Sequence, residues 1–352
     1  PFPWRRRDLA RGLPPRTVAR LARDTAARRW DGVPGDSLEA VLRRRVGTTL
    51  YQQFYGPYAE KLWGLPGAAL SVDQPGRPLS PDGARVYHYP RHGFGQICER
   101  LAEAAAKAGA RIELGLEVDG VKPTFDDVCV HARGGHEVTA GIAFCTLPLP
   151  VLGRVTTPGP SLAVVEDAAG LRRRSVVFVY VVHQGGRWTS YDSHHLPELD
   201  TPVTRISEPV NYRDSAADPR DHSVVCAEIP CDAGNPVWVA GDDALGDLVE
   251  EAVRRAGLPP LRRGDVVTRR LRDVSPVYDL GYRRRLAGIE RWVAGVPQVV
   301  TFGRLGLQPH SHDHRGLLEA YDAVDALGLD GRFDLSRWRR RRAAAAAGDR
   351  DA

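Results

Sequence analysis

Apolar residues recur every three or four positions in several stretches of the chain, which is the spacing of amphipathic helices. One helix is expected to begin after Ser37, a residue type that caps helix N-termini, and an aromatic-rich helix follows from Tyr51 to Trp63. Four further helices are predicted over residues 97–108, 245–256, 282–293 and 317–327. All of them except 282–293 end at a glycine, a common C-terminal cap.

Apolar and polar residues alternate in other stretches, which is the pattern of a strand with one buried face. A strand is expected over 111–118, and a pair of strands over 128–132 and 138–145 is joined by the turn Gly134-Gly135. His194-His195 is expected to lie in a polar loop that faces solvent. The other predicted strands cover 175–182, 203–207 and 223–229, which we assign to one sheet, and 266–274 and 298–302.

The composition is that of an ordinary soluble globular protein, with 42% apolar and 26% charged residues among 352. This length provides for two domains or one large domain. The longest uninterrupted apolar stretch, Val176 to Val182, is too short to span a bilayer, so we expect no transmembrane segment. The five cysteines form no C-x-x-C pair and fit reduced thiols, which predicts a cytoplasmic protein.

Cationic residues gather at the two ends of the chain. Residues 1–45 carry twelve Arg against five acidic residues, and residues 338–352 carry five Arg against two. The body between them is net acidic, although the whole chain has a charge of +5. Solvated basic helices at the ends explain this pattern better than a nucleic-acid-binding surface, so we expect no nucleic-acid partner.

Residues 298–327 form the most informative local unit. A buried strand leads into Gly303-Arg304-Leu305-Gly306, where the missing Cβ atoms allow a ligand to approach the backbone closely. A helix that begins at Asp313 directs its free N–H groups and its positive dipole end toward such a ligand, which favours negative charge there. The alternative is a plain strand–turn–helix with Asp313 as N-cap.

Four stretches, taken in order, resemble the FAD-dependent flavin amine oxidase superfamily in its protoporphyrinogen-oxidase-like branch, and more distantly UDP-galactopyranose mutase. The order and spacing of these stretches carry the resemblance, because no single one is decisive. They are Phe54-Tyr55-Gly56-Pro57-Tyr58-Ala59-Glu60-Lys61-Leu62-Trp63-Gly64, Tyr89-Pro90-Arg91-His92-Gly93-Phe94-Gly95-Gln96, Thr146-Leu147-Pro148-Leu149-Pro150, and Pro276-Val277-Tyr278-Asp279 leading into Gly303-Arg304-Leu305-Gly306 and Asp313-His314.

The resemblance implies an α/β plus α+β fold, in which an FAD/NAD(P)-binding Rossmann-like domain carries an inserted mixed-sheet substrate domain. The FAD-binding domain would comprise 88–160 and 296–328, and the substrate domain 30–87 and 161–295. Residues 1–29 and 329–352 would be basic helical ends. The cofactor implied is FAD, and the residues that match its contacts are Val118, Thr146, Pro148, Gly303, Arg304, Gly306, Asp313 and His314.

One family motif has no counterpart in this sequence. The superfamily's G-x-G-x-x-G fingerprint, which opens a helix onto the pyrophosphate, is best approximated by Gly93-Phe94-Gly95, where Cys98 takes the place of the third glycine. The chain also contains no methionine and begins Pro-Phe-Pro-Trp. Together these features predict a truncated FAD-binding domain whose pyrophosphate-binding segment is missing.

The aromatic helix and the segment before the glycine turn supply the candidate substrate residues Tyr58, Lys61, Trp63 and Tyr278. Lys61 could hold a water molecule near the reactive flavin atom, or it could be an interface lysine whose stem covers aromatic surface. Tyr278 could line the substrate pocket or be a buried structural tyrosine. The alternating residues His310, His312 and His314 suggest metal ligands only weakly, because no fourth ligand is evident, and no metal is predicted.

Three functional hypotheses follow. In the first, FAD takes a hydride from a C–N or C–C bond of a small or hydrophobic substrate. In the second, reduced flavin acts in an isomerase of the UDP-galactopyranose mutase type, which would need a site for a nucleotide diphosphate. In the third, the chain is an inactive truncated fragment that does not hold FAD.

Overall fold

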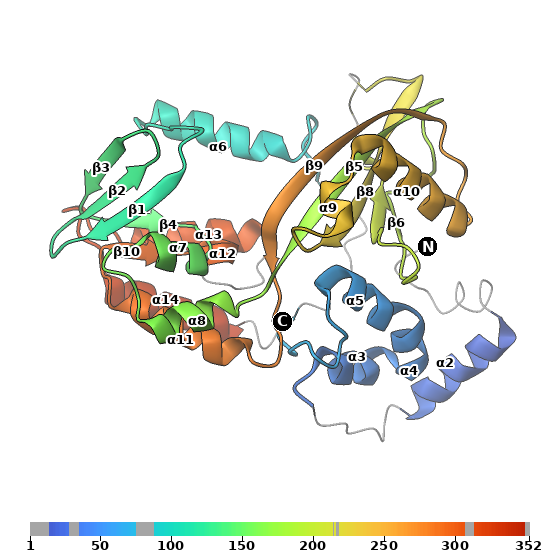
Figure 1. The fold of residues 1–352 in the computed structure, drawn as a ribbon, viewed down its shortest axis with the longest axis horizontal. Coiled ribbons are helices and arrows are strands. Elements are labelled where there is room, and N and C mark those ends of the chain that lie inside the picture. Colours follow the sequence, from blue (N-terminus) through green and yellow to red (C-terminus); the bar gives the residue numbers. More distant parts are fainter. Residues whose placement is uncertain are drawn as a thin grey trace. The chain divides into compact units, whose positions relative to one another are not determined.

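The computed structural model describes residues 14–27, 35–74, 88–213, 215, 218–306 and 313–348. The chain forms two compact units (Figure 1). Unit 1 comprises Pro1–Ile112 with Arg173–Leu280, and unit 2 comprises Glu113–Arg172 with Gly281–Ala352. Each unit is therefore assembled from two separate stretches of sequence.

Unit 1 is built on a five-stranded antiparallel sheet in the order β6-β7-β8-β5-β9 (Figure 1). The predicted sharing of one sheet by 175–182, 203–207 and 223–229 is confirmed. Along β5, alternate valines such as Val177 and Val179 are fully buried and pack against the apolar face of helix α10 (Asp242–Arg255). The strands are β5 (Arg173–Gln184), β6 (Ser193–His195), β7 (Arg205–Ser207), β8 (His222–Cys231) and β9 (Arg263–Pro276).

The helices predicted in the first part of unit 1 are present. Ser37 caps α3, where its hydroxyl accepts a hydrogen bond of 3.3 Å from the Ala40 amide. The aromatic helix contains one π-helical turn, η1, before it continues as α5, at whose start Pro57 lacks a backbone donor. The helical segments are α2 (Pro15–Ala27), α3 (Leu38–Val46), α4 (Thr48–Leu50), η1 (Tyr51–Tyr55), α5 (Gly56–Trp63), α6 (Gly95–Lys107), the 3₁₀ turn η3 (Pro209–Asn211) and α9 (Pro236–Val239).

Unit 2 contains two small sheets and a group of helices. The antiparallel sheet β1-β2-β3 consists of β1 (Val118–Pro123), β2 (Val128–Ala132) and β3 (His136–Ala140). The parallel pair consists of β4 (Ala143–Cys145) and β10 (Val299–Thr301). The helices are α7 (Leu149–Val155), α8 (Leu162–Ala169), α11 (Tyr282–Ala294), α12 (Gly303–Gly306), α13 (Asp313–Asp325) and α14 (Leu335–Gly348).

Two predicted strands need correction. The strand expected over 111–118 is wrong, because 111–117 is irregular and the strand begins at Val118. Leu114 is 88% exposed, so the alternating pattern there has neither a partner strand nor a core to bury it. The strand expected over 138–145 is divided by Gly141 into β3 and β4, which belong to different sheets.

The structure bears on two further expectations from the sequence. Among the described helices, none combines the length and the apolar character needed to cross a membrane. All five cysteines are free thiols in the structure. The predicted boundaries and roles of the FAD-binding and substrate domains stay predictions. The chain passes from one compact unit to the other after residues 112, 172 and 280.

Candidate functional site

The carboxyl ends of two parallel strands meet in unit 2. Cys145 of β4 is paired with Thr301 of β10, and the Phe302 amide donates a hydrogen bond of 3.2 Å to the Cys145 carbonyl. Beyond this pair the chain continues at Thr146 and at Gly303. In open α/β sheets, ligands bind at the carboxyl ends of parallel strands, so this edge is the candidate cofactor site.

The glycine turn is packed closely onto this edge. Gly303 has a φ of +76°, a conformation that side chains disfavour, and its amide donates a hydrogen bond of 2.8 Å to the Glu319 carboxylate. A Cβ on Gly306 would lie 3.0 Å from the Cys145 carbonyl oxygen. A Cβ on Gly303 would lie 3.8 Å from the Thr146 methyl group. The structure thus brings together Thr146, Gly303 and Gly306, which were predicted as cofactor contacts from separate parts of the sequence.

The other predicted cofactor residues lie elsewhere in unit 2, on β1, before α7, in α12 and at the start of α13. Val118 begins β1 and packs against the core of unit 2, and Pro148 is the residue before α7. Arg304 lies in α12 next to the glycines. Helix α13 begins at Asp313, as predicted, so its first backbone N–H groups lie at that end. The side chains of Asp313 and His314 lie outside the described residues, as do His310 and His312.

These features fit the flavin half of FAD. The turn allows close backbone approach, and the first turn of α13 offers N–H donors for an anionic ring edge. The 352-residue sequence contains no G-x-G-x-x-G, so no residue is assigned to the diphosphate.

Tyr58, the first of the predicted substrate residues, belongs to a buried contact in unit 1. Its hydroxyl lies 3.0 Å from Nδ1 of His195, and its ring stacks on Phe54 with 5.7 Å between ring centroids. Burial raises the pKa of Tyr58. Burial, and then the nearby Arg205 guanidinium, lowers the pKa of His195 to about 4. At neutral pH His195 is therefore uncharged, and its Nδ1 accepts the hydrogen bond from the phenol.

Lys61 has all three of its N–H donors on backbone carbonyls. Its Nζ lies 2.6 Å from the Leu196 oxygen, 2.8 Å from the Glu198 oxygen and 2.6 Å from the Val203 oxygen. An ammonium group has no further donor to offer. This arrangement favours the structural alternative, in which Lys61 holds the 196–203 segment against α5.

Trp63 and Tyr278 are buried at 8% and 3% exposure. Trp63 packs in the small core around α3 and α5. The Tyr278 amide donates a hydrogen bond of 2.6 Å to the side chain of Gln74, and its carbonyl accepts one of 2.7 Å from Ser71. The backbone of Tyr278 thus supports the 71–74 turn.

The polar face of the unit 1 sheet contains residues that the sequence reading missed. The expectation that His195 faces solvent from a loop is wrong, because it lies in β6, half-buried and paired with Arg205 of β7. Arg205 in turn forms an ion pair with Glu228 on β8. The same face carries Tyr180, Ser207, Tyr212 and Cys226. The sequence carried a signal for the strand residues of this face. They alternate with the buried valines, and every second residue of these strands must point away from α10.

A family model for flavin containing amine oxidoreductases matches residues 34–283. This range covers well over half of the chain and ends before β10 and the glycine turn. The chain belongs to the flavin-containing amine oxidoreductase family. Its cofactor is accordingly FAD. No curated protein sequence matches the chain.

Several solved structures share the fold of this chain. Reduced UDP-galactopyranose mutase aligns with a TM-score of 0.73 at 16% identity over 93% of this chain and 76% of that one. A protein of Exiguobacterium sp. 255-15, named as a protoporphyrinogen oxidase, has a TM-score of 0.61 at 18% identity over 84% and 69%. Putrescine oxidase bound to putrescine has a TM-score of 0.55 at 14% identity over 89% and 77%. At such identities the likeness concerns the fold alone.

Proposed function

We propose that this amine oxidoreductase family member transfers a hydride from a C–N or C–C bond of a small or hydrophobic substrate to FAD. The observation that carries the proposal is the Gly303–Gly306 turn packed against the carboxyl ends of β4 and β10. When bound there, the flavin supplies the hydride acceptor.

The chain's own residues would position and stabilise that ring. Gly303 and Gly306 leave space for close backbone approach, and Thr146 borders the same edge. The N-terminus of α13 would stabilise negative charge on the ring through its dipole and free N–H groups. We assign Val118, Pro148, Arg304, Asp313 and His314 to the cofactor side on the family pattern.

The domain assignment is part of the same proposal. FAD would bind to 88–160 and 296–328 as part of a Rossmann-like domain, and 30–87 with 161–295 would form the substrate domain. We assign Tyr58, Trp63 and Tyr278 to the substrate side, with Lys61 as the anchor of the segment beside Tyr58. The Tyr58–His195 pair, uncharged at neutral pH, would border the substrate beside the Arg205–Glu228 ion pair.

Retention of FAD tests the cofactor site directly. We expect purified protein mixed with FAD and then desalted to retain flavin absorbance. Gly306→Val should weaken FAD binding at least about tenfold, because the new side chain collides with the Cys145 backbone and displaces the turn. Gly241→Val, at the exposed residue before α10, is the matched control, since a Cβ there meets nothing within 4 Å. Failure of the parent chain to retain FAD would support the third hypothesis, an inactive fragment.

The substrate class is tested by turnover of the FAD-loaded protein. We expect primary amines or reduced tetrapyrroles to bleach the flavin without oxygen, and oxygen to restore it. If none of the substrates tried bleaches the flavin while FAD remains bound, the oxidoreductase proposal is contradicted.

A second candidate function, a mutase of the UDP-galactopyranose type, is favoured by one cavity of unit 1. This cavity of about 480 Å³ is lined by Arg187, Arg220 and His222, side chains that suit a nucleotide diphosphate, and by the Arg213–Asp218 ion pair. Binding of UDP that is weakened by Arg220→Ala would support it. Absence of UDP binding would eliminate it.

A cytoplasmic location remains part of the proposal. The five free thiols of the structure support it, because a reducing compartment keeps thiols unpaired. Fractionation of the source cells would test it.

A further inference from the structure

The three-stranded sheet of unit 2 has one packed face and one open face. Val121 and Val128 lie in the core with 5% and 0% exposure. Successive residues of a strand point to opposite faces, so their neighbours face the other way. Cross-strand pairing aligns these neighbours in two rows. One row consists of Gly120, His131 and Glu137, and the other of Lys122, Cys129 and Thr139.

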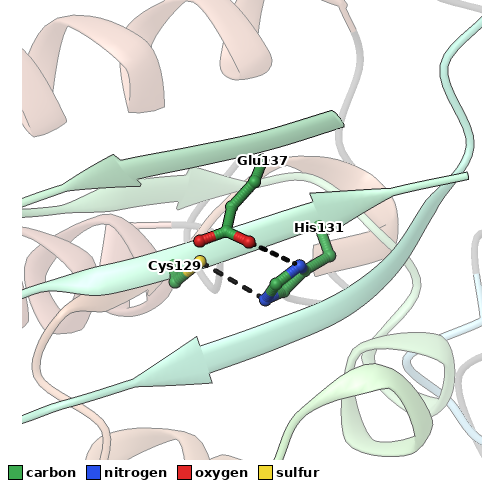
Figure 2. A group of neighbouring side chains, drawn as sticks. All are labelled: Cys129, His131 and Glu137. Carbon is green, nitrogen blue, oxygen red and sulfur yellow. Dashed lines mark hydrogen bonds and ion pairs between the residues drawn. The ribbon is translucent and has the colours of Figure 1, made fainter. Parts of the chain in front are cut away.

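Three potential metal ligands converge on this open face. Figure 2 shows Cys129, His131 and Glu137 directed toward one another from β2 and β3. The Cys129 sulfur lies 3.3 Å from Nε2 of His131, and Nδ1 of His131 lies 3.2 Å from a Glu137 oxygen. His131 thus links the thiol and the carboxylate, one through each of its ring nitrogens.

Gly120 leaves space for the imidazole ring. A Cβ on Gly120 would lie 3.2 Å from Cβ of His131 and 3.4 Å from its Cδ2. The ring therefore lies over a position where other residues would carry a side chain. The backbone of β1 has a register irregularity between Val118 and Gly120, which brings Gly120 opposite His131.

We propose that Cys129, His131 and Glu137 bind a thiophilic divalent cation of the Zn²⁺ class, with water completing its coordination. Their ligand atoms all lie within 4.8 Å of one another. A tetrahedral Zn²⁺ with bonds of about 2.0–2.3 Å holds neighbouring S, N and O ligands roughly 3.3–3.6 Å apart, which matches the 3.3 Å between the Cys129 sulfur and Nε2 of His131. Glu137 contacts the other ring nitrogen, so its carboxylate would turn toward Nε2 to become the third ligand. A thiolate and an imidazole select Zn²⁺ over Mg²⁺ or Ca²⁺, which prefer oxygen ligands.

The charges of the site balance on binding. The cation replaces the thiol proton, which passes to solvent, and a sulfur–metal bond forms with no change of oxidation state. Thiolate and carboxylate together neutralise the two positive charges. Lys122 is exposed, so water screens its repulsion of the cation.

Zinc titration of the full chain tests the site. We expect ZnCl₂, competed against a chromogenic chelator, to bind one ion per chain. Cys129→Ser and His131→Asn should each reduce the affinity at least about tenfold, because each removes a direct ligand. His136→Asn is the matched control, since this exposed histidine follows on β3 but lies outside the cluster.

Alkylation provides a readout that does not depend on the variants folding. Zn²⁺ should slow the reaction of iodoacetamide with Cys129, while the exposed Cys98 on α6 reacts at an unchanged rate. Mass spectrometry distinguishes the two cysteines. Equal rates at Cys129 with and without Zn²⁺, or equal losses of affinity in His136→Asn and Cys129→Ser, overturn the proposal.

Discussion

Two clusters of polar side chains, one in each unit, show how burial changes the role of the same chemical groups. In unit 1, the carboxylate of Glu208 is 1% exposed and accepts hydrogen bonds from the amides of Trp188 and Thr189. The hydroxyl of Ser223 and the side-chain amide of Asn211 also donate to it. In unit 2, the Glu137 side chain is 56% exposed and faces one histidine and one thiol.

The difference lies in what remains available to a ligand. A carboxylate has about four lone-pair directions, and four donors occupy those of Glu208. Its role is therefore to hold the 188–189, 208–211 and 223 segments together. Glu137 and its neighbours keep directions open to solvent, so they can exchange a proton for a cation. Substitutions of Glu208, His195 and Glu137 test this contrast, and their expected effects on stability fall in that order.

Glu208→Ala should produce the largest change. The amides of Trp188 and Thr189 and the Ser223 hydroxyl would lose this acceptor. The Asn211 side chain would keep its bonds to the Thr189 and Tyr191 carbonyls. We expect the free energy of unfolding to fall by about 3–5 kcal/mol. Chemical denaturation followed by fluorescence measures this. The control is Glu198→Ala, an exposed residue whose backbone carbonyl still accepts from Lys61, with a change within about 0.5 kcal/mol. Equal effects of the two substitutions would break the contrast.

Acid should destabilise unit 1 through His195. Its pKa is about 4 in the folded protein, below the ordinary value of 6.5 that applies to the unfolded chain, so between these pH values only the unfolded chain takes up the proton. Stability contributed by the neutral ring is complete above pH 6.5 and is lost as pH falls toward 4. We expect a loss of about 2 kcal/mol over this range.

Substitution distinguishes His195 from the other titrating groups. His195→Asn should remove this part of the pH dependence, because the amide does not titrate. The exposed His92 provides the control, and His92→Asn should leave the pH profile unchanged. A profile that stays the same in His195→Asn would contradict the assignment.

Glu137→Gln should have the smallest effect on stability. The His131–Glu137 pair is partly exposed, and surface pairs contribute about 0–1 kcal/mol. Without metal, thermal melting should therefore change little. A loss as large as that of Glu208→Ala would show that the open cluster is structural after all.

Local sequence patterns predicted much of the secondary structure. Ser37 caps α3 as its type and position indicated, and the alternating valines of β5 are buried as expected. The strand predicted over 111–118 failed because alternation says nothing of whether a neighbouring strand and a core exist. Leu114 and Ile112 follow the pattern and are nevertheless exposed.

The candidate sites divide in the same way. The order of family-like segments indicated FAD, and the glycine turn was visible from Gly303 and Gly306 alone. The contacts of Lys61 with three carbonyls about 140 residues away, at positions 196, 198 and 203, could not be predicted, because no local pattern specifies a distant backbone oxygen. Cys129, His131 and Glu137 likewise show no familiar metal-binding spacing in the sequence.

The sequence by itself determined the family, the cofactor and most of the long helices and strands, since these follow from motif order and hydrophobic period. Only the tertiary structure decided which polar groups are saturated and which stay open. Strand register placed Glu137 beside His131 and left Gly120 beneath the ring. Register depends on pairing between separate strands, so a short-range pattern does not encode it.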